Sequence, residues 1–188
     1  MDFIKLSPPH EDIVHDIAFD YYGKRFATCS SDKHIKIWSL SENNRTSNSN
    51  NNDHVINGDN TTGSNWISYD IPRAHQYSIW RLCWADPEFG QLLASCSEDR
   101  HIYLWEENES TTGCFLNANT GGSIADGRWK RYLVDTLSKS VNAIKFSHRK
   151  LGLRIASVCS DGYLRVHAAE DIFDMNKWER IVSLYVLM

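Results

Sequence analysis

The sequence predicts an all-β protein built from about three repeated four-stranded units. Two observations lead to this prediction. The composition is rich in large aromatic residues and poor in proline, with seven Trp, eight Tyr and four Pro, and three segments of the chain align with one another. Aromatic side chains favour strands because they fit a pleated, half-buried surface. Internal repeats indicate stacked supersecondary units within one domain.

The aligned segments cover residues 13–38, 78–105 and 140–167. Each contains an alternating strand, a turn with glycine, an apolar strand that ends near a serine, a tight turn with an aspartate, and a third strand. The turn aspartates of units 1, 2 and 3 are Asp32, Asp99 and Asp161, which lie 67 and 62 residues apart.

Two polar insertions explain why these separations exceed the usual 40 to 45 residues of a four-stranded repeat. Residues 41–65 contain nine Asn and no aromatic residue, so we expect a disordered loop that cannot bury enough apolar area to order itself. The second insertion covers residues 108–128. Both fall between the third and fourth strands, which puts them on the same face. The fourth strands are predicted at residues 66–71, 130–136 and 179–186, and the units at about 10–71, 75–136 and 138–186 of a single domain spanning 1–188.

Polar residues recur with these strands. In units 1 and 2 a Ser or Thr precedes the turn Asp by four residues, a Trp follows it by six, and a His precedes it by 22 or 24. A buried carboxylate needs hydrogen-bond donors, and a hydroxyl can link the His to the Trp indole N–H. We expect two structural tetrads: His10, Thr28, Asp32 and Trp38, and His75, Ser95, Asp99 and Trp105. Hydrolase triads use similar residue types, but recurrence in each unit favours a structural network.

Unit 3 departs from this pattern. Ser157 and Asp161 keep their spacing and form a partial tetrad, but His167 stands where the other units have Trp. The positions where the His is expected hold Leu137, Ser138 and Lys139. We therefore expect an incomplete network in unit 3, with His167 as a partly buried strand residue.

These residues resemble those of the WD-repeat β-propellers. The strings DYYGKRFATCSSDKHIKIW, WADPEFGQLLASCS and LWEE are similar to the small propellers shared by vesicle coats and the nuclear pore scaffold. That family contains the Sec-thirteen coat propeller and its nucleoporin homologue. The third unit favours the nucleoporin, because it resembles the nucleoporin pattern of an LGL turn, SDG and a short acidic helix that ends in Trp. The resemblance implies an open six-bladed propeller, with about three blades present here.

The resemblance also implies a function and partners. It indicates a non-enzymatic scaffold subunit of the Y-shaped nuclear pore complex at the nuclear envelope, which supports nucleocytoplasmic transport, including mRNA and protein transport, and pore assembly. In this family an α-helical nucleoporin donates an extra blade to the open ring, and other subunits of the Y-shaped complex are further partners. A family member also serves in a nutrient-signalling complex at the vacuolar or lysosomal membrane. Partner-contact residues are not assigned by the sequence, but the edge of the first blade is the expected region.

Two other functions remain open at this point. One is a vesicle-coat cage propeller in ER-to-Golgi transport, and the other is a propeller module that reads short peptides. Because propellers have about four to eight blades and the resemblance fades after Trp178, we also expect the sequence to be a fragment, or the product of an error in the predicted gene.

Charge and motifs disfavour several other classes of protein. The net charge of −4 argues against direct nucleic-acid binding through a broadly basic surface. The sequence has no apolar run of about 18 residues that could span a bilayer, no glycine-rich phosphate loop and no CxxC pair. We therefore expect no catalytic residues, cofactor or metal. The basic residues Arg128, Lys130 and Arg131 are interpreted as the solvent side of an outer strand.

Overall fold

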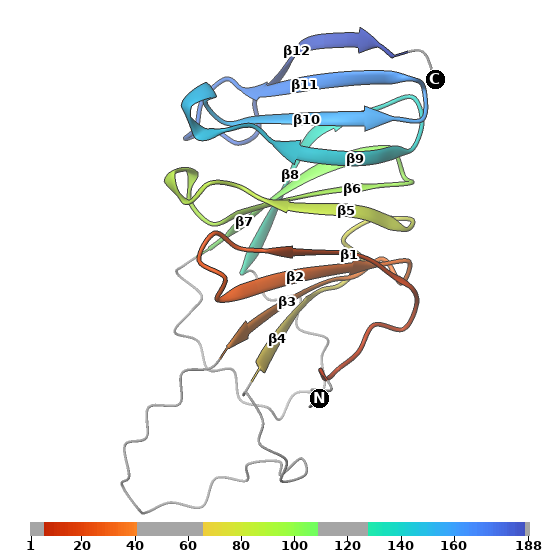
Figure 1. The fold of residues 1–188 in the computed structure, drawn as a ribbon, viewed down its shortest axis with the longest axis vertical. Coiled ribbons are helices and arrows are strands. Elements are labelled where there is room, and N and C mark those ends of the chain that lie inside the picture. Colours follow the sequence, from red (N-terminus) through yellow and green to blue (C-terminus); the bar gives the residue numbers. More distant parts are fainter. Residues whose placement is uncertain (1–5, 41–65, 109–127, 187–188) are drawn as a thin grey trace, which may run out of the picture.

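The described parts of the chain fold into three four-stranded antiparallel sheets. A computed structural model describes residues 6–40, 66–108 and 128–186. In each sheet the strands are neighbours in the order in which they occur in the chain, and the three sheets lie next to one another (Figure 1). We call these sheets blades 1, 2 and 3. The predicted all-β class and its four-stranded units are therefore confirmed.

Blade 1 contains β1 (Val14–Phe19), β2 (Arg25–Ser30), β3 (Ile35–Leu40) and β4 (Trp66–Ile71). Blade 2 contains β5 (Ile79–Trp84), the short 3₁₀ helix η1 (Pro87–Phe89), β6 (Leu92–Ser97), β7 (His101–Glu107) and β8 (Trp129–Thr136). Blade 3 contains β9 (Val141–Phe146), the 3₁₀ helix η3 (Arg149–Leu151), β10 (Arg154–Cys159), β11 (Tyr163–Ala169) and β12 (Trp178–Tyr185).

The fourth strands lie where the repeat placed them. β4 has the predicted bounds, while β8 and β12 each begin one residue earlier than predicted. The predicted disorder of 41–65 and most of the 108–128 insertion lie outside the described residues. One predicted detail is wrong: the acidic segment between β11 and β12 forms two successive turns and not a short helix. Asp171 and Asp174 side chains accept the backbone N–H groups two residues ahead, Phe173 and Asn176, and such bonds favour turns over helix.

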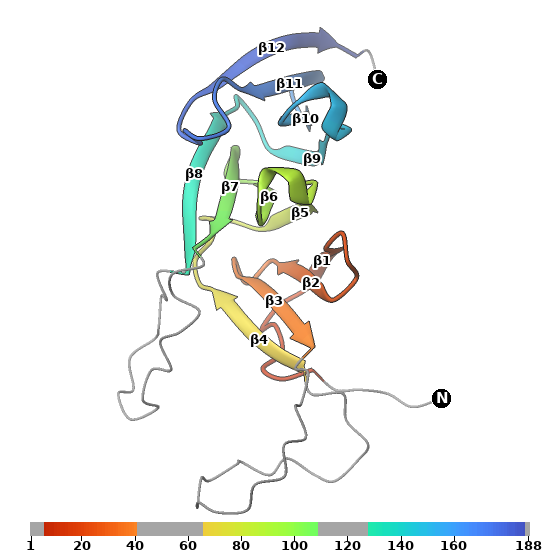
Figure 2. The ribbon, with the colours of Figure 1, turned by 90° about the vertical axis from the view of Figure 1, so that its left-hand side faces the viewer.

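The blades form an arc. β1, β5 and β9 lie on its concave side, and β4, β8 and β12 lie on the outside (Figure 2). One apolar cluster, containing Ala27, Ile37 and Leu93, fills the space between blades 1 and 2. A second, containing Leu104, Val141 and Ile155, fills the space between blades 2 and 3. The core is thus a set of layers between sheets, because each sheet must bury its apolar face against a neighbour.

The second strand of each blade lies deepest. All six residues of β6 are buried, since this strand has a paired strand on each side and a neighbouring blade over each face. In β10, residues alternate between the two faces. Ile155 is completely buried against blade 2, whereas Val158, on the opposite face, is 44% exposed.

This difference in burial predicts that shortening the two side chains to alanine lowers the free energy of unfolding by unequal amounts. Ile155→Ala should lower the free energy of unfolding by about 2–5 kcal/mol, because it removes buried methyl groups and leaves a cavity between two blades. Val158→Ala, in the same strand, should cost less than about 1 kcal/mol. Chemical denaturation of the two variants and the parent chain tests the prediction, and equal costs would contradict it.

Candidate functional site

The most complete polar network of the described chain lies in blade 2. The indole N–H of Trp105 donates to Ser95 Oγ at 2.8 Å, and Ser95 Oγ lies 2.7 Å from His75 Nε2. His75 Nδ1 lies 2.9 Å from Asp99 Oδ2. All four residues are buried. The structure thus brings together the four residues that the repeat spacing singled out in unit 2.

The protonation states follow from the hydrogen bonds. Ser95 Oγ accepts from Trp105, so its own proton points to His75 Nε2, and the proton of the imidazole sits on Nδ1 and is donated to Asp99. Desolvation by burial lowers the pKa of His75, against the hydrogen bond and charge of Asp99, so the ring is neutral near pH 7.

Asp99 is held as a carboxylate. It also accepts the backbone N–H groups of Gln76 and His101 at 2.9 and 3.0 Å. Burial acts to raise the pKa of Asp99, but these donors and His75 outweigh it and lower the pKa to about 2. The network therefore ties the turn after β6 to the segment that precedes β5 and to the strand β7.

Blade 1 has the same arrangement. The Trp38 indole donates to Thr28 Oγ1 at 3.0 Å, Thr28 Oγ1 lies 2.8 Å from His10 Nε2, and His10 Nδ1 lies 2.8 Å from Asp32 Oδ2. Asp32 also accepts the backbone N–H of Glu11 at 3.0 Å. Burial acts to raise the pKa of Asp32, but its hydrogen bonds lower it overall.

Blade 3 separates the partial tetrad into two networks. Ser157 Oγ lies 3.0 Å from His167 Nε2, while Asp161 forms a two-point ion pair with Arg165 at 3.0 and 2.7 Å. Ser138, one of the residues at the expected histidine position, donates to Asp161 at 2.5 Å. The hydrogen bond from Arg165 is the main reason why the pKa of Asp161 is lowered. The structure therefore does not join Ser157 to Asp161.

The expectation of a partly buried His167 is wrong, because this side chain is only 1% exposed. Its Nδ1 lies 3.3 Å from Asp135 Oδ2 of blade 2, and Asp135 also accepts from Arg180 of β12 at 2.6 Å. Desolvation by burial lowers the pKa of His167 to about 4. His167 thus occupies the place of the tetrad Trp and contacts the preceding blade.

Sequence reasoning missed an ion cluster between blades 1 and 2. Arg25 and Arg128 both bind Glu107, at 2.6 Å each, and the Arg128 guanidinium lies 4.0 Å from the centre of the Tyr69 ring. Arg128 was expected on the solvent side of an outer strand, but its side chain is only 17% exposed. Arg25 and Glu107 are separated by 82 positions in the sequence, and this separation leaves no periodic signal that could have revealed the pair.

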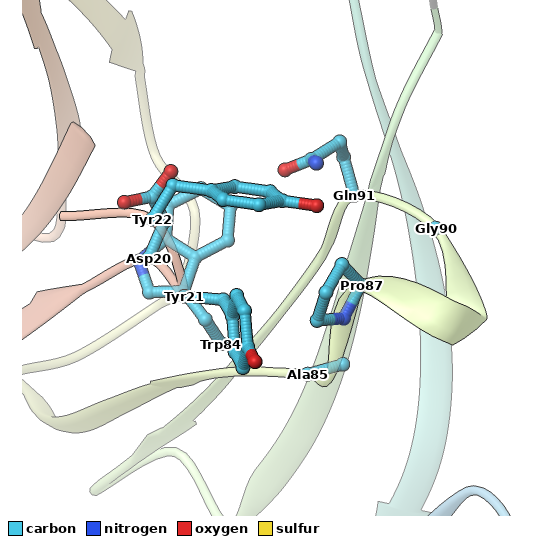
Figure 3. Close-up of a pocket in the computed structure, with 8 residues that line it drawn as sticks. All are labelled: Asp20, Tyr21, Tyr22, Trp84, Ala85, Pro87, Gly90 and Gln91. Carbon is cyan, nitrogen blue, oxygen red and sulfur yellow. The ribbon is translucent and has the colours of Figure 1, made fainter. Parts of the chain in front are cut away.

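A narrow slot lies near this cluster, between the β1–β2 turn and η1 (Figure 3). It is lined by aromatic rings, including Tyr21, Tyr22 and Trp84, and has room for about one water molecule. Its one carboxylate, Asp20, accepts the backbone N–H groups of Lys24 and Arg25. The carboxylate therefore stabilises the turn.

Within residues 6–40, 66–108 and 128–186, no helix is long and apolar enough to cross a membrane. The same residues contain no group of three or more His, Cys, Asp or Glu side chains that could hold a metal ion.

Comparisons with known proteins agree with this architecture. The family described as "WD domain, G-beta repeat" matches residues 3–39 and 68–106, which contain the two tetrads. The chain therefore contains WD repeats, and its three four-stranded sheets are consistent with part of a WD-repeat β-propeller.

Within this class, the chain is homologous to the nucleoporin SEH1 proteins. It is 34% identical over 175 residues to nucleoporin SEH1-A of Xenopus laevis and to nucleoporin SEH1 of Homo sapiens, and 31% identical to nucleoporin SEH1 of Danio rerio. Each alignment covers 92% of this chain but only 40–41% of the relative. The chain thus spans about two-fifths of the length of these relatives.

The network of blade 2 predicts a strong effect of Asp99→Ala. The substitution leaves buried donors without an acceptor and should lower the free energy of unfolding by about 3 kcal/mol. Asp70→Ala provides the control: Asp70 pairs with His34 on the surface and should contribute less than about 1 kcal/mol. Denaturation curves measure both, and an unchanged stability of Asp99→Ala would show that the network is dispensable.

The buried histidines predict an acid-sensitive fold. His167 has a pKa of about 4 in the folded chain and about 6.5 when unfolded. Its stabilising effect is therefore complete above pH 6.5 and is lost as the pH falls from 6.5 to 4, because only the unfolded chain binds the proton. The lowered pKa of His75 acts in the same direction.

His167→Gln keeps an acceptor for Ser157 but does not titrate. Its stability should therefore fall less than that of the parent chain between pH 7 and pH 5, by about 2 kcal/mol. Urea denaturation at several pH values measures this difference, and parallel pH profiles would contradict it.

Proposed function

We propose that this chain is a structural scaffold subunit of the Y-shaped complex of the nuclear pore and that it acts without catalysis. The support is its homology to proteins named nucleoporin SEH1. In this role it contributes to nucleocytoplasmic transport and pore assembly at the nuclear envelope. The nucleoporin names of the relatives favour the pore over the vesicle coat.

The structural observation that supports this proposal is an exposed apolar face on blade 1. Ile17 pairs with Thr28 of the neighbouring strand, as Leu82 pairs with Ser95 and Ile144 with Ser157, so Ile17, Leu82 and Ile144 are equivalent. Leu82 and Ile144 are 5% and 8% exposed, whereas Ile17 is 52% exposed.

Phe19 repeats the pattern. It occupies the position of Trp84 and Phe146, which pack against the two interblade clusters, but Phe19 is 60% exposed. Blade 1 therefore presents the side chains with which blades 2 and 3 contact a preceding blade. An exposed apolar surface of this kind marks an interaction site.

The occupant that fits this face is a further blade. An α-helical nucleoporin that donates one strand-rich segment would bury Ile17 and Phe19 in the way that blade 1 buries Leu82 and Trp84. Other subunits of the Y-shaped complex are further partners, and the same face could serve a nutrient-signalling complex at the vacuolar or lysosomal membrane.

The test is co-purification of the tagged endogenous protein, followed by identification of its partners by mass spectrometry. We expect nuclear pore scaffold subunits, with or without subunits of a nutrient-signalling complex. Recovery of vesicle-coat subunits in their place would assign the chain to the coat, and recovery of neither set would contradict a scaffold role.

Matched variants locate the contact. The double variant I17D/F19E should lose the partner, because it places two carboxylates in an apolar interface. Phe173→Glu provides the control, since Phe173 is 91% exposed in the loop before β12, away from blade 1. Loss of partners from the control alone, or full retention by the double variant, would move the contact to another surface.

A further inference from the structure

A second surface of the molecule remains unexplained by the scaffold role. It is a solvent-open hollow of about 490 Å³ lined by His15, Trp80, Arg81 and Asn142. These residues come from β1, β5 and β9, which lie side by side on the concave side of the arc (Figure 2). The hollow therefore lies on the inner side of the arc, where three blades meet.

Three of the lining residues occupy the same position of the repeat. The pairing of each inner strand with its neighbour shifts register by one residue, between Val14 and Asp16, between Ile79 and Arg81, and between Val141 and Ala143. The residues skipped by these shifts are His15, Trp80 and Asn142. A β-bulge of this kind re-aims the side chain of the extra residue, and here all three side chains line the hollow.

Hydroxyl groups hold each of these side chains. His15 Nε2 lies 2.6 Å from Ser31 Oγ, the Trp80 indole donates to Ser140 Oγ at 3.1 Å, and Ser160 Oγ donates to Asn142 Oδ1 at 3.0 Å. The rings of His15 and Trp80 also contact each other, with their centres 4.7 Å apart. The lining is thus a set of oriented groups.

The groups left over for a ligand are hydrogen-bond donors and an aromatic ring. Arg81 is exposed, and the structure gives its Nη1 two backbone carbonyls as acceptors, those of His15 and Trp80. Asn142 uses its carbonyl oxygen for Ser160, so its NH₂ group remains as a donor. The neighbouring strand also contributes a carboxylate, that of Asp16, which accepts the backbone N–H of Leu82 at 2.9 Å. A cation and an amide donor beside an aromatic ring favour a ligand that is anionic and partly apolar.

Further positive charge lies at the same end of the sheets. Lys33 and Arg100 occupy the turns after β2 and β6 with φ values of 72° and 75°, where blade 3 has Gly162. Residues other than glycine rarely adopt this conformation. Both side chains are exposed, and Glu98 lies close to Arg100 in the chain. Of these three cations, Arg81 is the one that lines the hollow.

We propose that this hollow binds an acidic peptide segment, with a glutamate or aspartate side chain on Arg81 and Asn142 and an adjacent apolar side chain on the ring of Trp80. The site is separate from the blade-docking face around Ile17 and Phe19, and it does not depend on the scaffold role. An acidic protein segment is favoured over nucleic acid, because the chain carries a net charge of −4 and a polyanion needs a broad basic surface.

The test measures binding of a fluorescein-labelled peptide that contains four glutamates around one leucine. The protein is purified from its own cells with its bound subunits, and fluorescence anisotropy is recorded. We expect saturable binding that is lost when glutamines replace the glutamates. Arg81→Gln should weaken binding about tenfold or more, as expected for loss of a charged hydrogen bond, whereas Lys150→Gln, in η3 at the opposite end of the sheets, should leave it unchanged.

Reversing the charge of Arg81 distinguishes a specific loss of binding at this site from a general loss of folding. Arg81→Glu should abolish binding of the glutamate peptide and create binding of the corresponding lysine peptide, while the same subunits continue to co-purify. Equal binding of the glutamine peptide, an unchanged affinity of Arg81→Gln or the absence of binding would each overturn the proposal. Displacement of the peptide by a single-stranded oligonucleotide of higher affinity would assign the hollow to nucleic acid.

Discussion

A buried hydroxyl at the centre of the second strand of each blade is the constraint on which the polar architecture depends. Thr28, Ser95 and Ser157 are 8%, 0% and 1% exposed, so each must find its hydrogen-bond partners inside the protein. In blades 1 and 2 the hydroxyl accepts from a Trp and bonds to a His. That His in turn reaches the turn aspartate, so one buried hydroxyl connects two strands, a turn and the incoming chain.

Blade 3 meets the same constraint in another way. His167 bonds directly to Ser157 from the place of the Trp, so no histidine is needed from the segment before β9. Asp161 is then without its usual partner, and Arg165, four residues further on, supplies the donors. The change also redirects the network, since the free nitrogen of His167 faces Asp135 of blade 2. A local substitution thus converts a network within one blade into a contact between two.

The sequence predicted the tetrad residues, which repeat, and missed the contacts that occur once. The Trp, Ser or Thr, and Asp spacing exposed the tetrad residues, because the four-stranded unit places the same positions together each time. The pairs Arg25–Glu107 and His167–Asp135 join neighbouring blades, and their separations follow no period. The alignment did contain a signal for the hollow: His15, Trp80 and Asn142 stand at one aligned position. Their residue types differ, however, and a register shift is visible only when strands are paired.

The buried networks and the hollow are connected through adjacent residues of the turns. Ser31 and Ser160, which hold His15 and Asn142, directly precede the turn aspartates Asp32 and Asp161. The hydrogen bonds of each aspartate fix its turn, and the turn in turn fixes the serine. Side chains that are positioned before a ligand arrives lose less conformational entropy on binding. One set of interactions therefore has two consequences: it makes the blades rigid, and it orients the side chains that line the concave side.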